Sequence, residues 1–213
     1  MSDHSVERVQ EGPSESFSSL GSITENLFAV IDRDNVHGLN LTIPEAAKDT
    51  IKPWNEREST EKYADSNVDD QMIIHIPFSQ NVRVRSLFLK LGRGEFTPRH
   101  LRVYANYPNI IDFADAEGTK PVLNISLLEG ETAVTEYPLR VAAFANVTSL
   151  SLFFSESIGG DCSRVYYIGF KGEARIARKP GTTKIEIPAA NAPDVTLTDR
   201  LSEKTAAPQP TAK

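Results

Sequence analysis

Apolar and polar residues alternate with a period of two over most of the middle of this chain. In QMIIHIPF, residues 71–78, the alternation places Met72, Ile74 and Ile76 on one side of an extended strand. Pro77 lacks the amide hydrogen that a ladder needs, so we expect this strand to end there. Four later segments repeat the pattern, namely LRVYAN, VLNISL, SLSLFF and RVYYIGF. Short strands separated by turn residues, with no amphipathic helices between them, predict an all-β fold built as an antiparallel β-sandwich.

The segment VRVRSLFLKL, residues 82–91, changes the phase of its alternation. Val82 and Val84 share one parity, whereas Leu87 and Leu89 take the other. A change of phase of this kind predicts a β-bulge, or a strand that is covered on both faces.

One short N-terminal helix is predicted where the folded part begins. Ser22 and Glu25 have the S-x-x-E spacing of a capping box, in which each side chain satisfies a backbone amide of the first turn. Leu27, Phe28 and Ile31 follow near one helical face.

Composition divides the chain into one folded domain and two tails. Residues 1–20 are rich in Ser and Glu, and residues 185–213 are rich in Pro, Ala and Thr, so both are predicted to be flexible. The folded domain is predicted to span residues 21–184.

Net charge and cysteine content argue against nucleic-acid-binding, membrane-spanning and secreted, disulfide-stabilised proteins. The net charge of −6 argues against a nucleic-acid surface, and no apolar run approaches the roughly 18 residues of a membrane helix. A single cysteine forms no internal disulfide, and the polar first residues lack the apolar core of a signal peptide. We therefore expect a cytosolic or nucleocytoplasmic protein with no nucleic-acid or membrane partner. These features leave the oligomeric state open, and a monomer is the favoured expectation.

The stretch SESIGGDCSRVYYIGFKGE contains that cysteine, Cys162, after two glycines. A phosphate-binding loop needs G-x-x-x-x-G-K-[ST], but here Asp161 follows the glycines and would repel phosphate. A reactive thiol needs a neighbour that lowers its pKa, and no histidine is near in sequence. We expect a tight turn between strands, with glycines free to adopt positive φ and Cys162 as a small filler. The residues assigned to this structural turn and strand motif are Gly159, Gly160, Asp161, Tyr167, Gly169 and Gly172.

Two further segments suggest binding rather than catalysis. DSNVDD, residues 65–70, begins like a calcium loop but lacks the glycine and glutamate that such a loop requires, so no metal site is predicted. KPWNER, residues 52–57, holds the single tryptophan, which either anchors an interface or packs at the edge of the core. No catalytic motif and no cofactor motif is present, and we predict that the chain is not an enzyme.

The ordered segments NLFAVIDRDNVHGLN, IKPWNER, YADSNVDDQMIIHIPFSQNVRVRSL and SESIGGDCSRVYYIGFKGE resemble the PITH domain family. The resemblance covers about residues 23–175. It implies a jelly-roll sandwich of the galactose-binding-domain-like kind, association with the 26S proteasome regulatory particle, and a cytoplasmic and nuclear location. The family also includes the C-terminal domains of thioredoxin-like proteins. This chain has no C-x-x-C sequence, so their redox activity does not transfer.

Residues and resemblance together predict a protein-binding module that contacts its partner through loops of the sandwich. The expected contact residues are an aromatic and cationic centre with an acidic rim, namely Lys52, Trp54, Arg57, Asp65, Asp69 and Asp70. The alternative is a jelly-roll module that binds a small, carbohydrate-like ligand, because KPWNER and DSNVDD could together supply an aromatic platform with polar neighbours.

Overall fold

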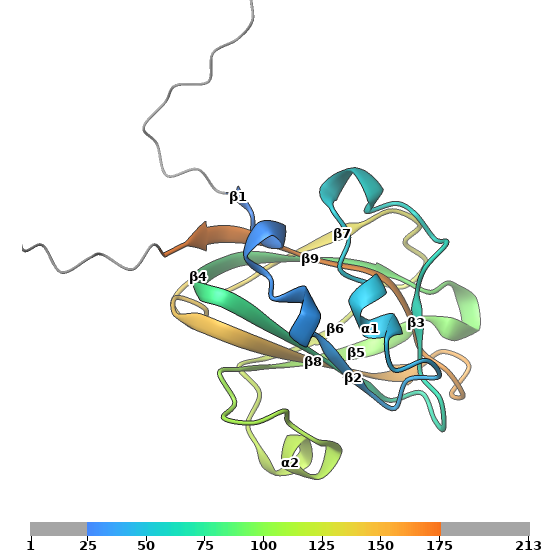
Figure 1. Ribbon diagram of the computed structural model, residues 1–213. Coiled ribbons are helices and arrows are strands. Elements are labelled where there is room, and N and C mark those ends of the chain that lie inside the picture. Colours follow the sequence, from blue (N-terminus) through green and yellow to red (C-terminus); the bar gives the residue numbers. More distant parts are fainter. Residues whose placement is uncertain (1–24, 176–213) are drawn as a thin grey trace, which may run out of the picture. The chain divides into compact units, whose positions relative to one another are not determined.

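The computed structural model describes residues 25–175, and Figure 1 shows how their elements are arranged. Nine strands form one continuous antiparallel sheet with the order β1-β9-β4-β8-β5-β6, to which β2 and β7 add at β4 and β3 adds at β9. The strands are β1 (Glu25–Asn26), β2 (His37–Leu39), β3 (Ala64–Asp65), β4 (Met72–Leu91), β5 (Pro98–Ala105), β6 (Leu123–Ser126), β7 (Thr135–Pro138), β8 (Val147–Ser157) and β9 (Arg164–Ala174). The helices and 3-10 turns are η1 (Leu27–Val30), η2 (Arg33–Asn35), α1 (Ala46–Asp49), η3 (Trp54–Glu56), η4 (Gly94–Phe96) and α2 (Phe113–Gly118). The prediction of an all-β, antiparallel fold is confirmed.

The long strand β4 joins the two halves of this sheet. Its residues 72–77 pair with β8, and its residues 82–91 pair with β9. Val82 stands at the change, because it is in register with Val147 of β8 and with Ala174 of β9. Side chains from both halves, such as Ile74 and Leu87, belong to one apolar core. The sheet therefore encloses its core as a sandwich does, with β4 passing from one half to the other.

The predicted end of a strand at Pro77 is wrong, because β4 continues through it. Pro77 pairs with Ser149 of β8, and its carbonyl accepts a hydrogen bond from the amide of Asp32 at 2.9 Å. The register with β8 shifts immediately afterwards, between Pro77 and Val82. The proline, which has no amide hydrogen, thus lies where β4 changes its pairing from β8 to β9. It accompanies an irregularity in the strand and does not end it.

The change of phase in residues 82–91 is confirmed as a β-bulge. Val84 pairs with Gly172 and Ser86 pairs with Lys171, so Arg85 is the extra residue on the β4 side. The bulge reverses the parity of β4 and brings Leu87 and Leu89 onto the core face that Val82 and Val84 occupy before it.

The predicted N-terminal helix is instead a single 3-10 turn, η1. Its cap is Asn26, whose side-chain oxygen accepts from the amide of Phe28 at 2.9 Å. Residues 25 and 26 are extended because they pair with β9, which leaves Glu25 unable to serve as the third residue of a helix. Ser22 lies outside the described residues, as do the predicted tail residues 1–20 and 185–213.

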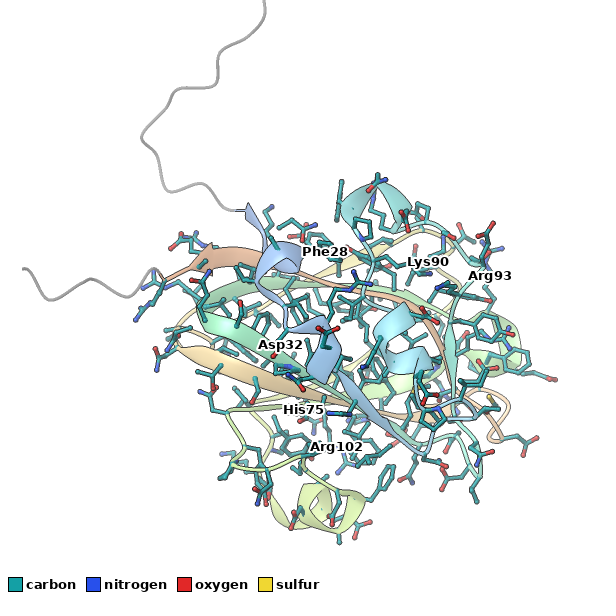
Figure 2. The ribbon with its side chains drawn as sticks, viewed as in Figure 1. Phe28, Asp32, His75, Lys90, Arg93 and Arg102 are labelled. Carbon is teal, nitrogen blue, oxygen red and sulfur yellow. The ribbon has the colours of Figure 1, made fainter. Side chains whose placement is uncertain are left out.

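A second, smaller cluster explains why several strand positions are apolar on both faces. Ile73 of β4 and Phe153 of β8 point away from the main core and pack with Ala116 of α2 and with Ile111, which precedes this helix. The guanidinium of Arg102 lies 4.1 Å from the centre of the Phe153 ring (Figure 2). The short helix α2 was not predicted, since six residues are too few to show a helical period.

Candidate protein-binding site

The stretch around Cys162 is a turn, as the sequence indicated. It joins β8 to β9, and Gly160 has a φ of +79°. At Gly159 an added Cβ would stand 2.8 Å from the Cβ of Glu95, so the neighbouring loop requires a glycine there. Asp161 is exposed. Cys162 is half-buried, with its thiol 3.5 Å from the carbonyl of Ser66.

The remaining members of the motif hold β9 against its neighbours. Tyr167 is fully buried, and burial raises the pKa of its hydroxyl. An added Cβ at Gly169 would stand 2.3 Å from that hydroxyl oxygen, so glycine leaves room for the Tyr167 ring. At Gly172 the added Cβ would stand 2.0 Å from the carbonyl oxygen of Arg83, next to the bulge in β4.

Lys52 lies inside the loop that carries the tryptophan, not on its surface. The residue is 6% exposed, and its ammonium donates to the carbonyls of Ser59 (3.0 Å) and Lys62 (2.7 Å). Desolvation by burial lowers the pKa of Lys52. Lys52 was expected to contact a partner, but it is buried and instead holds together the loop of residues 53–62, which carries Trp54.

A second lysine anchors the same loop to the sheet. Lys90 of β4, labelled in Figure 2, is 6% exposed and donates to the carbonyl of Glu58 at 3.0 Å, while its ammonium also pairs with the Glu58 carboxylate. The hydrogen bond from Lys90 lowers the pKa of Glu58. The other oxygen of that carboxylate accepts from the amide of Val134 at 3.2 Å.

Trp54 begins the 3-10 turn η3 and is 43% exposed. Its ring meets Phe88 of β4 edge to face, with 5.1 Å between the ring centres. The guanidinium of Arg57 stacks 4.2 Å from the centre of the indole and donates to the Trp54 carbonyl at 2.8 Å. The tryptophan is thus held between a ring and a cation while nearly half of its surface stays open.

A hollow of about 240 Å³ adjoins this tryptophan, and we call it the Trp54 hollow. It is lined by Asn26, Trp54, Phe88 and Lys171. Trp54 was identified from the sequence, but the other three were not. Phe88 had a signal, because it is an apolar residue at an outward position between the core residues Leu87 and Leu89.

The three expected acidic residues each have a local partner. Asp65 accepts two hydrogen bonds of 2.6 Å from the guanidinium of Arg164, and these bonds raise the pKa of Arg164. Asp69 accepts from the side chain of Asn40 at 2.7 Å and from the amide of Gln71 at 3.0 Å.

Asp70 accepts from the amide of Ser157 at 2.6 Å. The three carboxylates therefore organise the loops that bear them.

The structure divides the predicted contact set between two places. The Trp54 hollow reaches Lys171 of β9, whereas Asp65 pairs with Arg164 at the start of the same strand. Lys171 lies seven residues after Arg164 on β9, which corresponds to roughly 23 Å along the strand. Trp54 and Arg57 form one site, and the acidic residues belong to another part of the surface.

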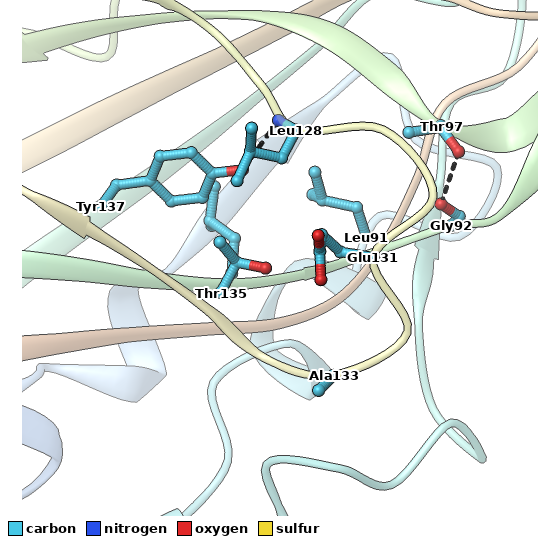
Figure 3. A pocket seen from close by; sticks show the side chains of 9 residues that line it. Leu91, Gly92, Thr97, Leu128, Glu131, Ala133, Thr135 and Tyr137 are labelled. Carbon is cyan, nitrogen blue, oxygen red and sulfur yellow. Dashed lines mark hydrogen bonds between the residues drawn. The ribbon is translucent and has the colours of Figure 1, made fainter.

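A further pocket, drawn in Figure 3, is too small for a ligand. It has a volume of about 10 Å³, which is close to the least that accommodates one water molecule. The hydroxyl of Tyr137 accepts from the amide of Leu128 at 3.1 Å, and Thr97 donates to the Gly92 carbonyl at 2.8 Å. Polar groups that line this pocket are therefore already hydrogen-bonded to one another.

Residues 25–175 contain no group of three His, Cys, Asp or Glu side chains that could hold a metal ion. In the same part of the chain, no helix has the length and apolarity required to cross a membrane.

The chain is thus an antiparallel sandwich whose candidate site is a stacked tryptophan beside a hollow. The PITH domain family model matches residues 18–189, and the chain belongs to the PITH domain family. PITH domain-containing protein CG6153 of Drosophila melanogaster is 32% identical over 161 residues, which cover 76% of this chain and 75% of the relative. Human PITH domain-containing protein 1 is 31% identical over 147 residues, which cover 69% of each chain.

The solved structures that align with this chain include CBM32 domains and lectins. The CBM32-1 and CBM32-2 domains of Clostridium perfringens ZmpB, in complex with GalNAc, have a TM-score of 0.49 and 11% identity over 68% of this chain and 35% of that one. A fucolectin from striped bass serum has a TM-score of 0.48 and 13% identity over 72% of this chain and 49% of that one. GalNAc is the ligand of the ZmpB domains in that complex.

Proposed function

We propose that this chain is a non-enzymatic binding module that associates with the 26S proteasome regulatory particle in the cytoplasm and nucleus. The proteasome as the partner rests on membership of the PITH domain family. The names of the relatives above describe no catalytic activity.

The observation that supports the contact site best is the open, stacked Trp54. Tryptophan and arginine are the residue types most enriched among binding hot spots, and here Arg57 lies 4.2 Å from the indole. Two buried lysines hold the loop in place, so little order has to be created on binding. A partner side chain that enters the hollow would be covered by Trp54 and Phe88, with Asn26 and Lys171 as polar neighbours.

The proposal is tested by affinity purification of the tagged chain from cell lysate, followed by mass spectrometry of the proteasome subunits. We expect the double variant Trp54→Ala with Arg57→Ala to lose most of the co-purified subunits, because each hot-spot residue is worth about 2 kcal/mol or more. The control is Ile110→Ala with Lys120→Ala, which likewise removes one exposed apolar side chain and one cation, here an exposed one. Unchanged recovery by a folded Trp54 and Arg57 double variant would exclude this site.

The alternative function, binding of a small carbohydrate-like ligand, predicts a different result. It was based on KPWNER and DSNVDD acting together. Trp54 of KPWNER lies beside Lys171 of β9, whereas Asp65 of DSNVDD pairs with Arg164 at the start of that strand. The Trp54 hollow by itself still offers an aromatic wall with Asn26 and Lys171. Glycan-array binding that is lost in Trp54→Ala, together with no recovery of proteasome subunits, would favour this alternative.

A further inference from the structure

Exposed apolar side chains gather at one end of the sandwich, on four loops that we call the loop end (residues 40–45, 63–70, 93–97 and 156–164). These loops make up 28 of the 151 described residues. Of the ten large apolar side chains exposed in that part of the chain, five lie on the loop end: Ile43, Tyr63, Val68, Phe96 and Ile158. Half of the exposed apolar side chains thus lie on less than a fifth of the residues.

Backbone hydrogen bonds fix the four loops to one another. The amide of Thr42 donates to the backbone carbonyl of Asp65, and the amide of Ser66 donates to that of Ser163, each at 3.0 Å. The amides of Ile158 and Gly159 donate to the loop of residues 93–97 at 3.1 and 2.9 Å. The exposed side chains therefore sit on a connected and preorganised surface, which lowers the entropic cost of binding.

The centre of the loop end is an arginine among aromatic rings. The guanidinium of Arg164 lies 4.0 Å from the ring centre of Tyr63, 4.7 Å from that of Phe96 and 6.0 Å from that of Tyr166. Its charge is matched by the two hydrogen bonds to Asp65. Tyr63 and Phe96 are 39% and 40% exposed, so rings held by this arginine face the solvent. Such a set of fixed aromatic residues is typical of the centre of a protein interface.

The charge around these rings indicates the kind of partner. The loop end contains seven carboxylate residues against two basic ones, Arg93 and Arg164, which gives a balance of −5. The whole chain has a net charge of −6. Glu95 and Asp161, next to Phe96 and to the Gly159–Gly160 turn, form no ion pair with a described residue. An acidic surface of this density attracts positive charge and repels acidic segments.

We propose that the loop end is a second binding surface, which takes a basic segment of a partner protein whose apolar side chain packs on Tyr63 and Phe96. Lysine or arginine side chains of that segment face Glu95 and Asp161. This surface shares no residue with the lining of the Trp54 hollow.

The test uses the full chain and two fluorescein-labelled twelve-residue peptides, one of Lys and Leu and one of Glu and Leu, in fluorescence polarisation. We expect binding of the Lys and Leu peptide alone, and an affinity that falls as salt rises from about 50 to about 300 mM. The double variant Glu95→Gln with Asp161→Asn should weaken this binding by about three- to tenfold. Phe96→Ala should weaken it by about tenfold through loss of the apolar contact.

The control variant Asp34→Asn with Glu117→Gln removes two exposed carboxylates outside the loop end and should leave the affinity unchanged. Trp54→Ala should also leave it unchanged, which separates this surface from the proposed proteasome contact. Equal weakening by the control and by the Glu95 and Asp161 variant would overturn the proposal, because the attraction would then be general. So would binding of neither peptide, or a change in sedimentation that shows a second copy of the chain on this surface.

Discussion

Single residues determine where the strands of this domain turn. Asn106 has a φ of +55°, and its side-chain oxygen accepts from the amide of Thr148 at 2.7 Å, so it directs the chain out of β5. Asn40 has a φ of +56° and accepts from the amide of Val68 at 3.1 Å. Both positions use the amide side chain to replace a backbone partner in a left-handed conformation that asparagine tolerates. At Gly160 the same region of φ is occupied by a residue without a Cβ.

The substitution Gly160→Val tests the turn at this scale. Nothing lies within 4 Å of an added Cβ, so any loss comes from the backbone conformation and not from a clash. We expect the free energy of unfolding to fall by about 1–3 kcal/mol, because a β-branched residue strongly disfavours positive φ. Urea denaturation measures the change.

Gly160→Asn serves as the control for that measurement. Asparagine tolerates positive φ, so its loss should be clearly smaller than that of valine. Equal stability of the valine variant and the parent would contradict the argument.

At the scale of elements, β4 is the strand on which the rest depends. It pairs with β8 before residue 82 and with β9 after it, and the bulge at Arg85 corrects its parity for the second half. The bulge brings the Arg83 carbonyl so close to Gly172 that only a glycine fits on β9. Arg83 and Arg85 both pair with Glu173, so the two strands are also joined by charge next to the bulge.

Gly172→Ala tests this close approach. Its Cβ would stand 2.0 Å from the Arg83 oxygen, and a backbone atom cannot move aside without shifting β4. We expect the free energy of unfolding to fall by about 1–3 kcal/mol, as for overpacking in a core. Thermal and urea denaturation of purified protein measure it.

Gly118→Ala is the matched control, because nothing lies within 4 Å of the added Cβ and its φ is not in the left-handed range. It should be neutral, or more stable by about 0.4–1 kcal/mol through a smaller entropy of the unfolded chain. A Gly172 variant as stable as the Gly118 variant would show that the bulge yields without cost.

At the scale of the whole described domain, one core carries two separate surfaces. Side chains of both sheet halves pack together, and the Trp54 hollow and the loop end lie beside different parts of β9.

The stability of the domain is also linked to pH. His75 of β4 lies opposite His37 of β2, and its ring nitrogen is 2.9 Å from the hydroxyl of Ser151. Burial, and then the charge of His37, lower the pKa of His75 below its ordinary value of 6.5.

The domain should therefore lose stability in weak acid. As pH falls below 6.5, the unfolded chain takes up a proton at His75 while the folded protein does not, so the free energy of unfolding decreases until the folded His75 also titrates. We expect the Tm to fall between about pH 7.5 and pH 5.5. Differential scanning calorimetry across this range measures the slope.

His75→Gln should flatten that slope, and His37→Gln should flatten it partly by removing the neighbouring charge. A slope that is the same in parent and His75→Gln protein would refute the linkage. Glu58 acts at lower pH, because its pKa is lowered from 4.5 by the bond to Lys90, and its contribution is lost only as pH falls below that value.

Much of the fold could be predicted because strand signals are local. The alternation of apolar residues identified the segments that form β4, β5, β6, β8 and β9, but not the short strands β1, β2, β3 and β7. The change of phase indicated a bulge within residues 82–91, and the glycine pair indicated the turn at Gly160. The strand end predicted at Pro77 was wrong, and the predicted N-terminal helix is present only as the 3-10 turn η1, which begins at Leu27 and not after Ser22. The two differences have a common reason. In both places pairing with a distant strand, β8 or β9, outweighed the local preference of the sequence.

The candidate site was only partly predictable. Trp54 and Arg57 are three residues apart, and their stacking follows from a short turn. Phe88 and Lys171 reach the same hollow from two other strands, and no local pattern connects them to Trp54.

The sequence by itself determined the class of fold, the turn at Gly160 and the family, because each depends on the order of residues over short stretches. Only the tertiary structure decided which charged side chains are exposed and which are bound within the domain. Lys52 is buried and donates to two carbonyls, and Asp65 is paired with Arg164, 99 residues away. Burial and long-range pairing depend on how distant strands meet, since the free energy of a charge is governed by its surroundings in space rather than by its neighbours in the chain.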